Sequence, residues 1–351
     1  MFQILIKKFA YGILVLGGVV IVVFLIFQAF SDPARMVLGQ TGDQKTMDNI
    51  RKELYLDQPK WKQFVFYVND ISPIAIHSKE EIKLKNLHGF FLRIGSNEKI
   101  GIKIPFLRRS YQTKKPVTEV LMEALPGTAL LACAAMLFAI VVGIFLGILA
   151  AIKQNTWLDT TSVFASVIGI SAPSFFMAIV IAYVFGLVLH DYTGLSLTGS
   201  WFDIDQATGK RYLTLQNLIL PALTLGIRPL SIITQLTRSS MLDTLNHDYI
   251  RTAYAKGLSK RKVVFHHALR NAINPVLTAI TGWFAELLAG AFFVEYIFGW
   301  KGIGKVTVDA LEKLDYPVVM GSVLFAATIF VFINILADVL YGIIDPRVKI
   351  Q

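Results

Sequence analysis

Cysteine is almost absent from this chain, which has only Cys133 among 351 residues. A single cysteine, here within an apolar run, excludes an internal disulfide framework and a zinc site built from several thiolates. Charged residues are also scarce, at 17% of the chain against roughly 25% in typical soluble domains. Long uncharged runs take their place, and they indicate a membrane protein.

Recognisable catalytic motifs are missing as well. The sequence contains no His-Glu-x-x-His zinc helix and no Gly-x-Ser-x-Gly nucleophile turn. His266 and His267 are adjacent, so on a helix they diverge by about 100° and make a poor metal pair. Ser171 and Ser196 have no evident basic partner, which disfavours an intramembrane protease. We therefore expect a chain that is not an enzyme and that binds neither a metal nor a cofactor.

One stretch imitates a nucleotide-binding motif. "GWKGIGKV" (299–306) has the spacing of a phosphate-binding P-loop, but Val306 stands where a Mg²⁺-binding hydroxyl is required, and Thr307 comes one position late. A P-loop also follows a strand, whereas this stretch follows an apolar run. We therefore do not expect ATP to bind here.

Six apolar segments are long enough to cross a membrane. The first, Phe9 to Phe30, has 22 residues without a charge, about 33 Å as a helix, against a hydrocarbon core of about 30 Å. It is too long for the apolar part of a signal peptide, and Ala29-Phe30-Ser31 is a poor cleavage site, so we expect it to be retained. Proline within these segments, such as Pro173, is ordinary in membrane helices. The other five lie at about 126–152, 160–189, 214–236, 273–297 and 318–344.

Lysine and arginine indicate the orientation of the spans. The net charge of +10 would suit a nucleic-acid partner, but basic residues of membrane proteins collect in cytoplasmic loops, so we expect none. Cations are more numerous on the side of the termini than in the short loops 190–213 and 298–317. The 31–123 loop exceeds the ~60 residues over which loop charge governs orientation. We predict that both termini are cytoplasmic. The cations on their side are Lys7, Lys8, Lys153, the 238–270 cluster, Arg347 and Lys349.

These spans predict an all-α polytopic membrane protein with six transmembrane helices. Residues 1–30 would hold the N-terminus and first span, and residues 31–123 an external loop that forms a small lid or subdomain, with a helix-like stretch at 48–55. Residues 124–351 would form a five-helix core with a cytoplasmic region at 238–272.

Four ionisable residues lie within or near spans, where charge is costly and suggests function. Glu295 and Asp338 lie near span ends, where we expect them to reach water. Arg228 lies about 15 Å before Arg238 and Glu286 about 16 Å after Pro275, so both lie at a similar depth from the cytoplasmic face. We predict that Arg228 and Glu286 pair across two spans or jointly line a translocation path, and a purely structural ion pair is an open alternative.

The basic stretch from Asp248 to Pro275 favours two short helices with a break at Gly257. Asp248 would cap the first helix and Ser259 the second, while Gly257 takes a positive φ. Tyr249, Ala253 and Gly257 recur at intervals of four and form one stripe of mainly small residues. Such a surface would bind either anionic lipid or another protein, and the bent shape favours a protein.

The chain resembles the membrane-spanning permease subunits of binding-protein-dependent ABC importers, in the dipeptide, oligopeptide and nickel branch. The most specific match is "LILPALTLG" (218–226) followed by "LTRSSMLDTLNHDYIRTAYAKGL" (236–258). The resemblance covers nearly the whole chain. Further matches are "SDPARMVLG" (31–39), "IRKELYLDQP" (50–59), "LPGTALL" (125–131), "GIFLGILAA" (143–151), "ISAPSFF" (170–176), "GWKGIG" (299–304) and "DPR" (345–347).

The resemblance implies a cytoplasmic coupling helix that seats in an ATPase subunit. The family's Glu-Ala-Ala-x-x-x-Gly pattern falls on Arg251, Thr252, Ala253 and Gly257, so its Glu and first Ala are replaced here. It assigns docking to Ala253 and Gly257, with Tyr249, Arg251 and Lys256 as flanking contacts. Residues 77–104 look like an insertion relative to the branch, and Arg228 and Glu286 stand where the branch usually has Pro and a small residue. Candidate residues for the translocation pathway are Ser171, Pro173, Arg228, Glu286 and Glu295.

The resemblance also implies partners and a location. They are a second homologous permease, two cytoplasmic ATP-binding subunits that use ATP and Mg²⁺, an external solute-binding protein and the lipid of a prokaryotic plasma membrane. Peptides are the default substrate, and nickel complexes or glutathione-like solutes are alternatives within the branch. An ion-driven secondary carrier, a membrane-bound enzyme and a membrane-anchored peptide receptor are the rival interpretations from outside it.

Overall fold

The computed structural model describes residues 2–29, 51, 55–94, 97–204 and 209–344. The chain folds as two compact units, one of residues 1–9, 124–305 and 328–351, the other of residues 10–123 and 306–327. The motifs at 31–39 and 345–347, and nearly all of the predicted helix at 48–55, lie outside the described residues.

Among the described residues, five helical segments are each long and apolar enough to cross a membrane, and a bent pair makes a sixth if it forms one span. This confirms the mainly helical polytopic fold. Interior prolines such as Pro126 are accommodated without ending the helix, as expected where neighbours satisfy the freed carbonyls. The spanning helices are α1 (Phe2–Ala29), α6 (Val117–Ile152), η3 with α10 (Leu215–Leu218, Ile219–Leu245), α12, η4 and α13 in succession (Lys260–Lys262, Val263–Ala268, Leu269–Ala289) and α16 (Tyr316–Ile344).

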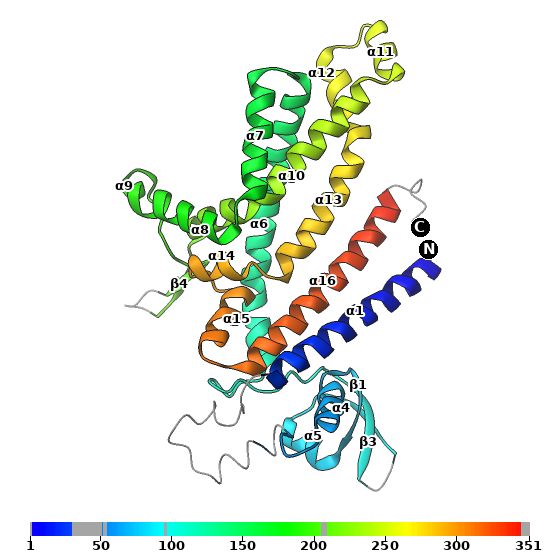
Figure 1. The fold of residues 1–351 in the computed structure, drawn as a ribbon, viewed down its shortest axis with the longest axis vertical. Helices are drawn as coiled ribbons and strands as arrows, with labels where there is room; N and C mark the ends of the chain where they lie inside the picture. The colour runs from blue at the N-terminus through cyan, green and yellow to red at the C-terminus, as the bar shows by residue number, and fades with distance from the viewer. Residues whose placement is uncertain (1, 30–50, 52–54, 95–96, 205–208, 345–351) are drawn as a thin grey trace. The chain divides into compact units, whose positions relative to one another are not determined.

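The predicted span at 160–189 is not one straight helix. It consists of α7 (Trp157–Ser171) and α8 (Ser174–Tyr183), which continues into η2 (Val184–Val188), with a bend of 109° between them. Figure 1 shows α8 turning sharply away from α7. The cause is Pro173, which has no N–H to donate and forces the preceding residue out of the helical region. Ala172 accordingly has φ −73° and ψ 129°.

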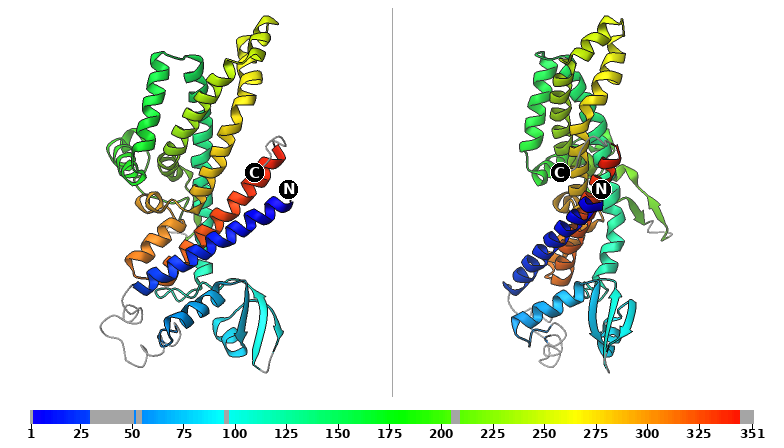
Figure 2. Two further views of the ribbon diagram at one scale, coloured as in Figure 1. Left: turned by 45° about the vertical axis from the view of Figure 1, so that its right-hand side comes forward. Right: turned by 90° about the vertical axis from the view of Figure 1, so that its right-hand side faces the viewer.

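Close helix packing holds the first unit together. A Cβ on Gly147 of α6 would lie only 2.5 Å from Thr237 Cβ of α10, so these helices approach as closely as small residues in membrane helices permit. α13 runs alongside α10 (Figure 2). Arg238 of α10 binds Asp159 of α7 through two hydrogen bonds, Nε to Oδ1 at 2.5 Å and Nη2 to Oδ2 at 2.8 Å. The unit also contains α9 (His190–Thr193), β4 (Phe202–Ile204) paired with β5 (Arg211–Leu213), α11 (Asp248–Ala255), α14 (Phe292–Ile297) and the start of α15 (Ile303–Glu312).

The second unit contains a small α/β subdomain at residues 60–103, where we predicted a lid or subdomain and an all-α fold. Its antiparallel sheet has the strand order β1 (Ile74–Ser78), β3 (Glu98–Lys103), β2 (Gly89–Arg93). Its helix α4 (Lys60–Ile71) packs on α1 through ring contacts of Phe24 with Phe64 (5.1 Å) and Tyr67 (5.9 Å). The subdomain also contains α5 (Lys79–Lys85).

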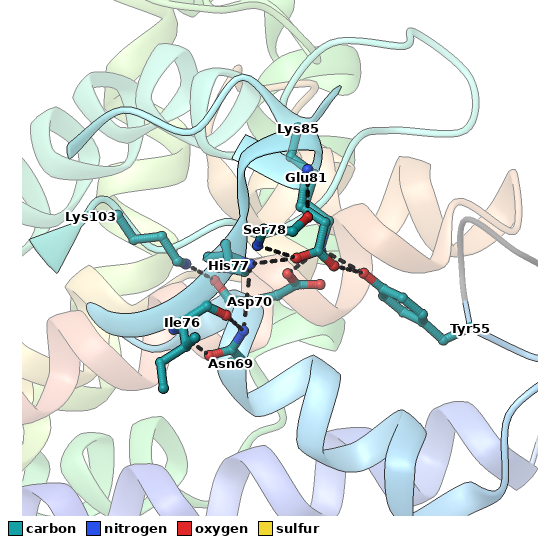
Figure 3. Close-up of polar contacts among 9 residues, drawn as sticks. All are labelled: Tyr55, Asn69, Asp70, Ile76, His77, Ser78, Glu81, Lys85 and Lys103. Carbon is teal, nitrogen blue, oxygen red and sulfur yellow. Dashed lines mark hydrogen bonds and ion pairs between the residues drawn. The ribbon is translucent and has the colours of Figure 1, made fainter. Parts of the chain in front are cut away.

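A network of ionisable groups lies within this 60–103 subdomain (Figure 3). Asp70 is 2% exposed, and its carboxylate pairs with the Lys85 ammonium at 2.5 Å. The Lys103 ammonium donates to the Asp70 carbonyl, and burial lowers the pKa of Lys103 to about 8. Glu81 completes a capping box with Ser78 at the start of α5. Every one of these charges therefore has a partner within its own chain.

Candidate functional site

The stretch 248–275 forms the predicted pair of helical segments with a break at Gly257. α11 ends at Ala255, just before this break, where Gly257 has φ 75° and the Leu258 N–H donates to the Ala253 carbonyl. The capping predictions were wrong in detail. Asp248 is the first helical residue rather than the cap, and Ser259 occupies the cap position of α12 without a capping hydrogen bond.

Ala253 corrects the proposed stripe of small residues. It is only 6% exposed and packs into the chain's own core, so it does not lie on an open surface beside Tyr249 and Gly257. A four-residue interval cannot tell which side of a helix faces its own protein. The buried cluster that includes Ala253 joins α6, α10, α11, η4 and α13 through Ile148, Ala151, Met241, Ile250, Val263, Val264, Ala268 and Ala272.

The other predicted coupling residues are exposed. Tyr249 accepts a hydrogen bond from Asn271 Nδ2 at 3.0 Å, and Arg251 lies 3.4 Å from the Asp248 carboxylate, both on the surface. Lys256 and Gly257 are exposed at the turn. Sequence reasoning missed Phe265, which is 53% exposed. A large apolar residue within a basic stretch was the available signal. The ATPase-docking role of this surface stays a prediction.

A cavity of about 210 Å³ lies among α7, α8, α10, α13 and α14. Arg228 and Glu286 both line it, and both are exposed. The Arg228 guanidinium lies over the Trp283 ring, 5.3 Å from its centroid. In the described part of the chain, Arg228 and Glu286 do not approach within the 4.0 Å of an ion pair. The structure thus brings the two residues to one cavity without pairing them, and their part in translocation stays a prediction.

Trp283 is a cavity residue that sequence reasoning missed. It precedes Glu286 by three residues on α13, and residues three apart lie on the same face of a helix. That spacing was the signal. Ser171 and Pro173 lie at the break between α7 and α8, but the residues there that line the cavity are Ala172 and Ser174.

Glu295 was expected to reach water, and it is instead 0% exposed. Thr128 Oγ1 donates to its carboxylate at 2.8 Å, and the backbone N–H groups of Gly304 and Lys305 donate at 2.7 and 3.2 Å. A Cβ on Gly302 would lie 2.3 Å from Glu295 Oε2, so a larger residue there would have to displace the carboxylate from its hydrogen bonds. The stretch that imitates a P-loop does place N–H groups around an anion, but that anion is the chain's own carboxylate.

Asp338, His266 and His267 are not among the residues that line the cavity. Asp338 forms an ion pair with Lys8 and is partly exposed. The rings of His266 and His267 are 5.3 Å apart and nearly perpendicular. Within the described ranges, three or more His, Cys, Asp or Glu side chains nowhere gather in a way that could hold a metal ion.

Comparison with known proteins gives consistent matches over most of the chain. The family model described as binding-protein-dependent transport system inner membrane component matches residues 143–350, and the model of its N-terminal part matches residues 1–82. The dipeptide transport system permease protein DppB of Alkalihalophilus pseudofirmus is 35% identical, over 95% of this chain and 96% of that protein. The protein of the same name from Escherichia coli K12 is 34% identical over 99% of both.

A solved structure shows the same fold. The methionine ABC transporter MetNI in an inward-facing conformation matches with a TM-score of 0.51 and 15% identity, over 65% of this chain and 97% of that one. At this identity the likeness concerns the arrangement of the helices only.

Proposed function

This chain belongs to the family of binding-protein-dependent transport system inner membrane components, and we propose that it is the permease subunit of an ATP-driven importer for peptides. The peptide assignment is supported by the names of relatives that match nearly end to end, which are dipeptide permeases. Nickel complexes and glutathione-like solutes, which the resemblance to this branch also admits, are the alternatives.

The single observation that carries the coupling role is the core shared by α11 and the cavity helices. Ile250 and Ala253 of α11 pack with Met241 of α10 and Ala272 of α13. α10 and α13 also carry Arg228 and Glu286 to the cavity. Packed cores transmit displacement because they deform little. A partner that moves α11 would therefore move the two helices that line the cavity.

In this proposal the partners supply what the chain lacks. Two cytoplasmic ATP-binding subunits would bind ATP and Mg²⁺, and one of them would dock on the exposed surface of Tyr249, Arg251, Lys256 and Gly257. A second permease would complete the pathway, and an external solute-binding protein would deliver the solute. This chain would carry out no catalysis of its own. Both termini would be cytoplasmic, with the 60–103 subdomain on the external side. Such coupling requires that the ATP-binding subunits contact α11 differently in their two states.

Substitution of Gly257 tests the docking surface. Gly257→Val places a branched side chain at φ 75°, a conformation costly for any residue but glycine, on an open surface. We expect insertion into the membrane to persist, and co-purification of the ATP-binding subunits and ATP-driven peptide uptake to fall at least tenfold.

The matched control is Gly209→Val. Gly209 has φ 66° and equally open surroundings, but it lies in the loop between β4 and β5. The Gly209→Val variant should retain both co-purification of the ATP-binding subunits and ATP-driven peptide uptake. Uptake at the unsubstituted level by Gly257→Val would refute the docking assignment.

A further inference from the structure

We propose that the cavity among α7, α8, α10, α13 and α14 binds a small zwitterionic solute, with the solute's carboxylate at Arg228 and its ammonium group at Glu286. This inference rests on the proposed function, because it names the charge pattern of the solute that the permease carries.

The first argument is the charge of the cavity. Arg228 and Glu286 lie on helices apolar enough to span a membrane, where an uncompensated charge is costly. Arg228 stacks on the Trp283 ring, and no ion pair joins it to Glu286 in the described part of the chain. A simple ion would neutralise one of the two and leave the other exposed. A molecule with one charge of each sign neutralises both.

The backbone at the cavity also favours a bound ligand. Two helix breaks meet at the cavity, one at Ala172, before Pro173, and the other at Gly290, whose φ is 129°. At membrane depth, broken helices persist only where they are buried in protein or line a water-filled cavity. α8 begins at Ser174, on the cavity, and its N-terminus carries partial positive charge that favours a carboxylate. α13 ends at Ala289, and its C-terminus favours a cation.

The third argument is the size and the lining of the cavity. Its volume of about 210 Å³ lies below the roughly 300–1,000 Å³ of pockets for drug-sized ligands. Met177, Leu225 and Phe293 give it apolar walls. Such walls exclude water without selecting a particular group, so the two charges provide the specificity and the walls accept different apolar side chains. The site therefore suits a solute of amino-acid to dipeptide size.

Capped dipeptides test the assignment on the purified full-length chain in lipid nanodiscs. The probes are dialanine, which carries both charges, N-acetyl-dialanine, which lacks the ammonium group, and dialanine amide, which lacks the carboxylate. Binding is followed by saturation-transfer NMR. We expect each capped probe to bind roughly 10- to 100-fold more weakly than dialanine, the value of one hydrogen-bonded charge.

Two variants separate a ligand contact from a structural role. Arg228→Gln should bind dialanine and its amide equally and still discriminate against the acetylated probe. Glu286→Gln should show the reverse pattern. Arg211→Gln is the matched control, because Arg211 also lies over an aromatic ring, that of Phe202, but outside the cavity. It should leave all three affinities unchanged.

Equal binding of the three probes to the unsubstituted chain, or no binding, would overturn the inference. So would variants that lose all three probes alike, because that result assigns the two residues to the architecture or to contact with a second permease. Co-purification of the ATP-binding subunits, measured in parallel, separates the two claims. A chain that co-purifies with the ATP-binding subunits but binds the three probes equally refutes only the binding site. A chain that discriminates among the probes but does not co-purify with those subunits refutes only the proposed coupling.

Discussion

The loop around Glu295 and the cavity around Glu286 treat a carboxylate in opposite ways, although the two residues are close in sequence. Glu295 is completely buried, and its oxygens accept hydrogen bonds from Thr128, Gly304 and Lys305. Glu286 is exposed to a cavity that it shares with Arg228, with which it forms no ion pair in the described part of the chain. A buried carboxylate with all its partners in its own chain indicates architecture. An exposed one without them, on a membrane helix, indicates a ligand or a partner.

The largest expected effect on the free energy of unfolding comes from removing the Glu295 carboxylate, and removal of the Glu286 carboxylate is the comparison. Glu295→Ala would leave buried donors without an acceptor, each costing about 1–3 kcal/mol, and should lower the free energy of unfolding by about 3–5 kcal/mol. Glu286→Ala should change it by less than about 0.5 kcal/mol, as at exposed sites. The measurement is denaturation of the purified protein in mixed micelles. Equal destabilisation by the two variants would break the comparison.

A smaller effect is expected from Gly302, which contacts the buried carboxylate. In Gly302→Ala the new Cβ would lie 2.3 Å from Glu295 Oε2 and 2.6 Å from Thr128 Oγ1. Overpacking of this kind costs about 1–3 kcal/mol. The control is Gly282→Ala in α13, where a Cβ would meet nothing within 4 Å and where alanine should stabilise the helix by roughly 0.5–1 kcal/mol. The same denaturation assay measures both, and a neutral Gly302→Ala would show that the loop around Glu295 is not rigid.

The spanning helices were predictable from sequence because an apolar run of sufficient length is a local property. The bend at Pro173 was not, because prolines such as Pro126 and Pro173 look alike in sequence although only the second breaks its helix. The bend depends on whether neighbouring segments can satisfy the freed backbone groups, which is a tertiary property.

The candidate sites were predictable in kind but not in their contacts. The similar depth of Arg228 and Glu286 could be read from distances along two helices, and the structure places both on one cavity. The burial of Glu295 could not, because its partner Thr128 is 167 residues away. The strands of the 60–103 subdomain were partly predictable. Ile74 and Ile76, and then Ile100 and Ile102, recur with the two-residue period of a β-strand.

The smallest expected effect concerns Glu81, a third carboxylate whose partners are its own chain's but which is partly open to solvent. The His77 ring beside it, opposed by partial burial, sets its pKa at about 2, against an ordinary value of 4.5. A carboxylate with a lowered pKa stabilises the fold above its unfolded pKa, and this contribution is lost as the pH falls from 4.5 through 2. Because the Glu81 side chain is 32% exposed, solvent screens these interactions, and we expect a loss of only about 1 kcal/mol. Hydrogen exchange of the α5 amides in the full-length chain, corrected for intrinsic rates, measures it between about pH 5 and pH 2. Glu81→Gln should remove the pH dependence, whereas an unchanged profile in that variant would show that Glu81 is not its source. Loss of the pH dependence in Glu81→Gln would make Glu81 an intermediate case. Its carboxylate has partners in its own chain, as that of Glu295 has, but it is also open to solvent, whereas Glu286 faces a cavity where we propose a ligand.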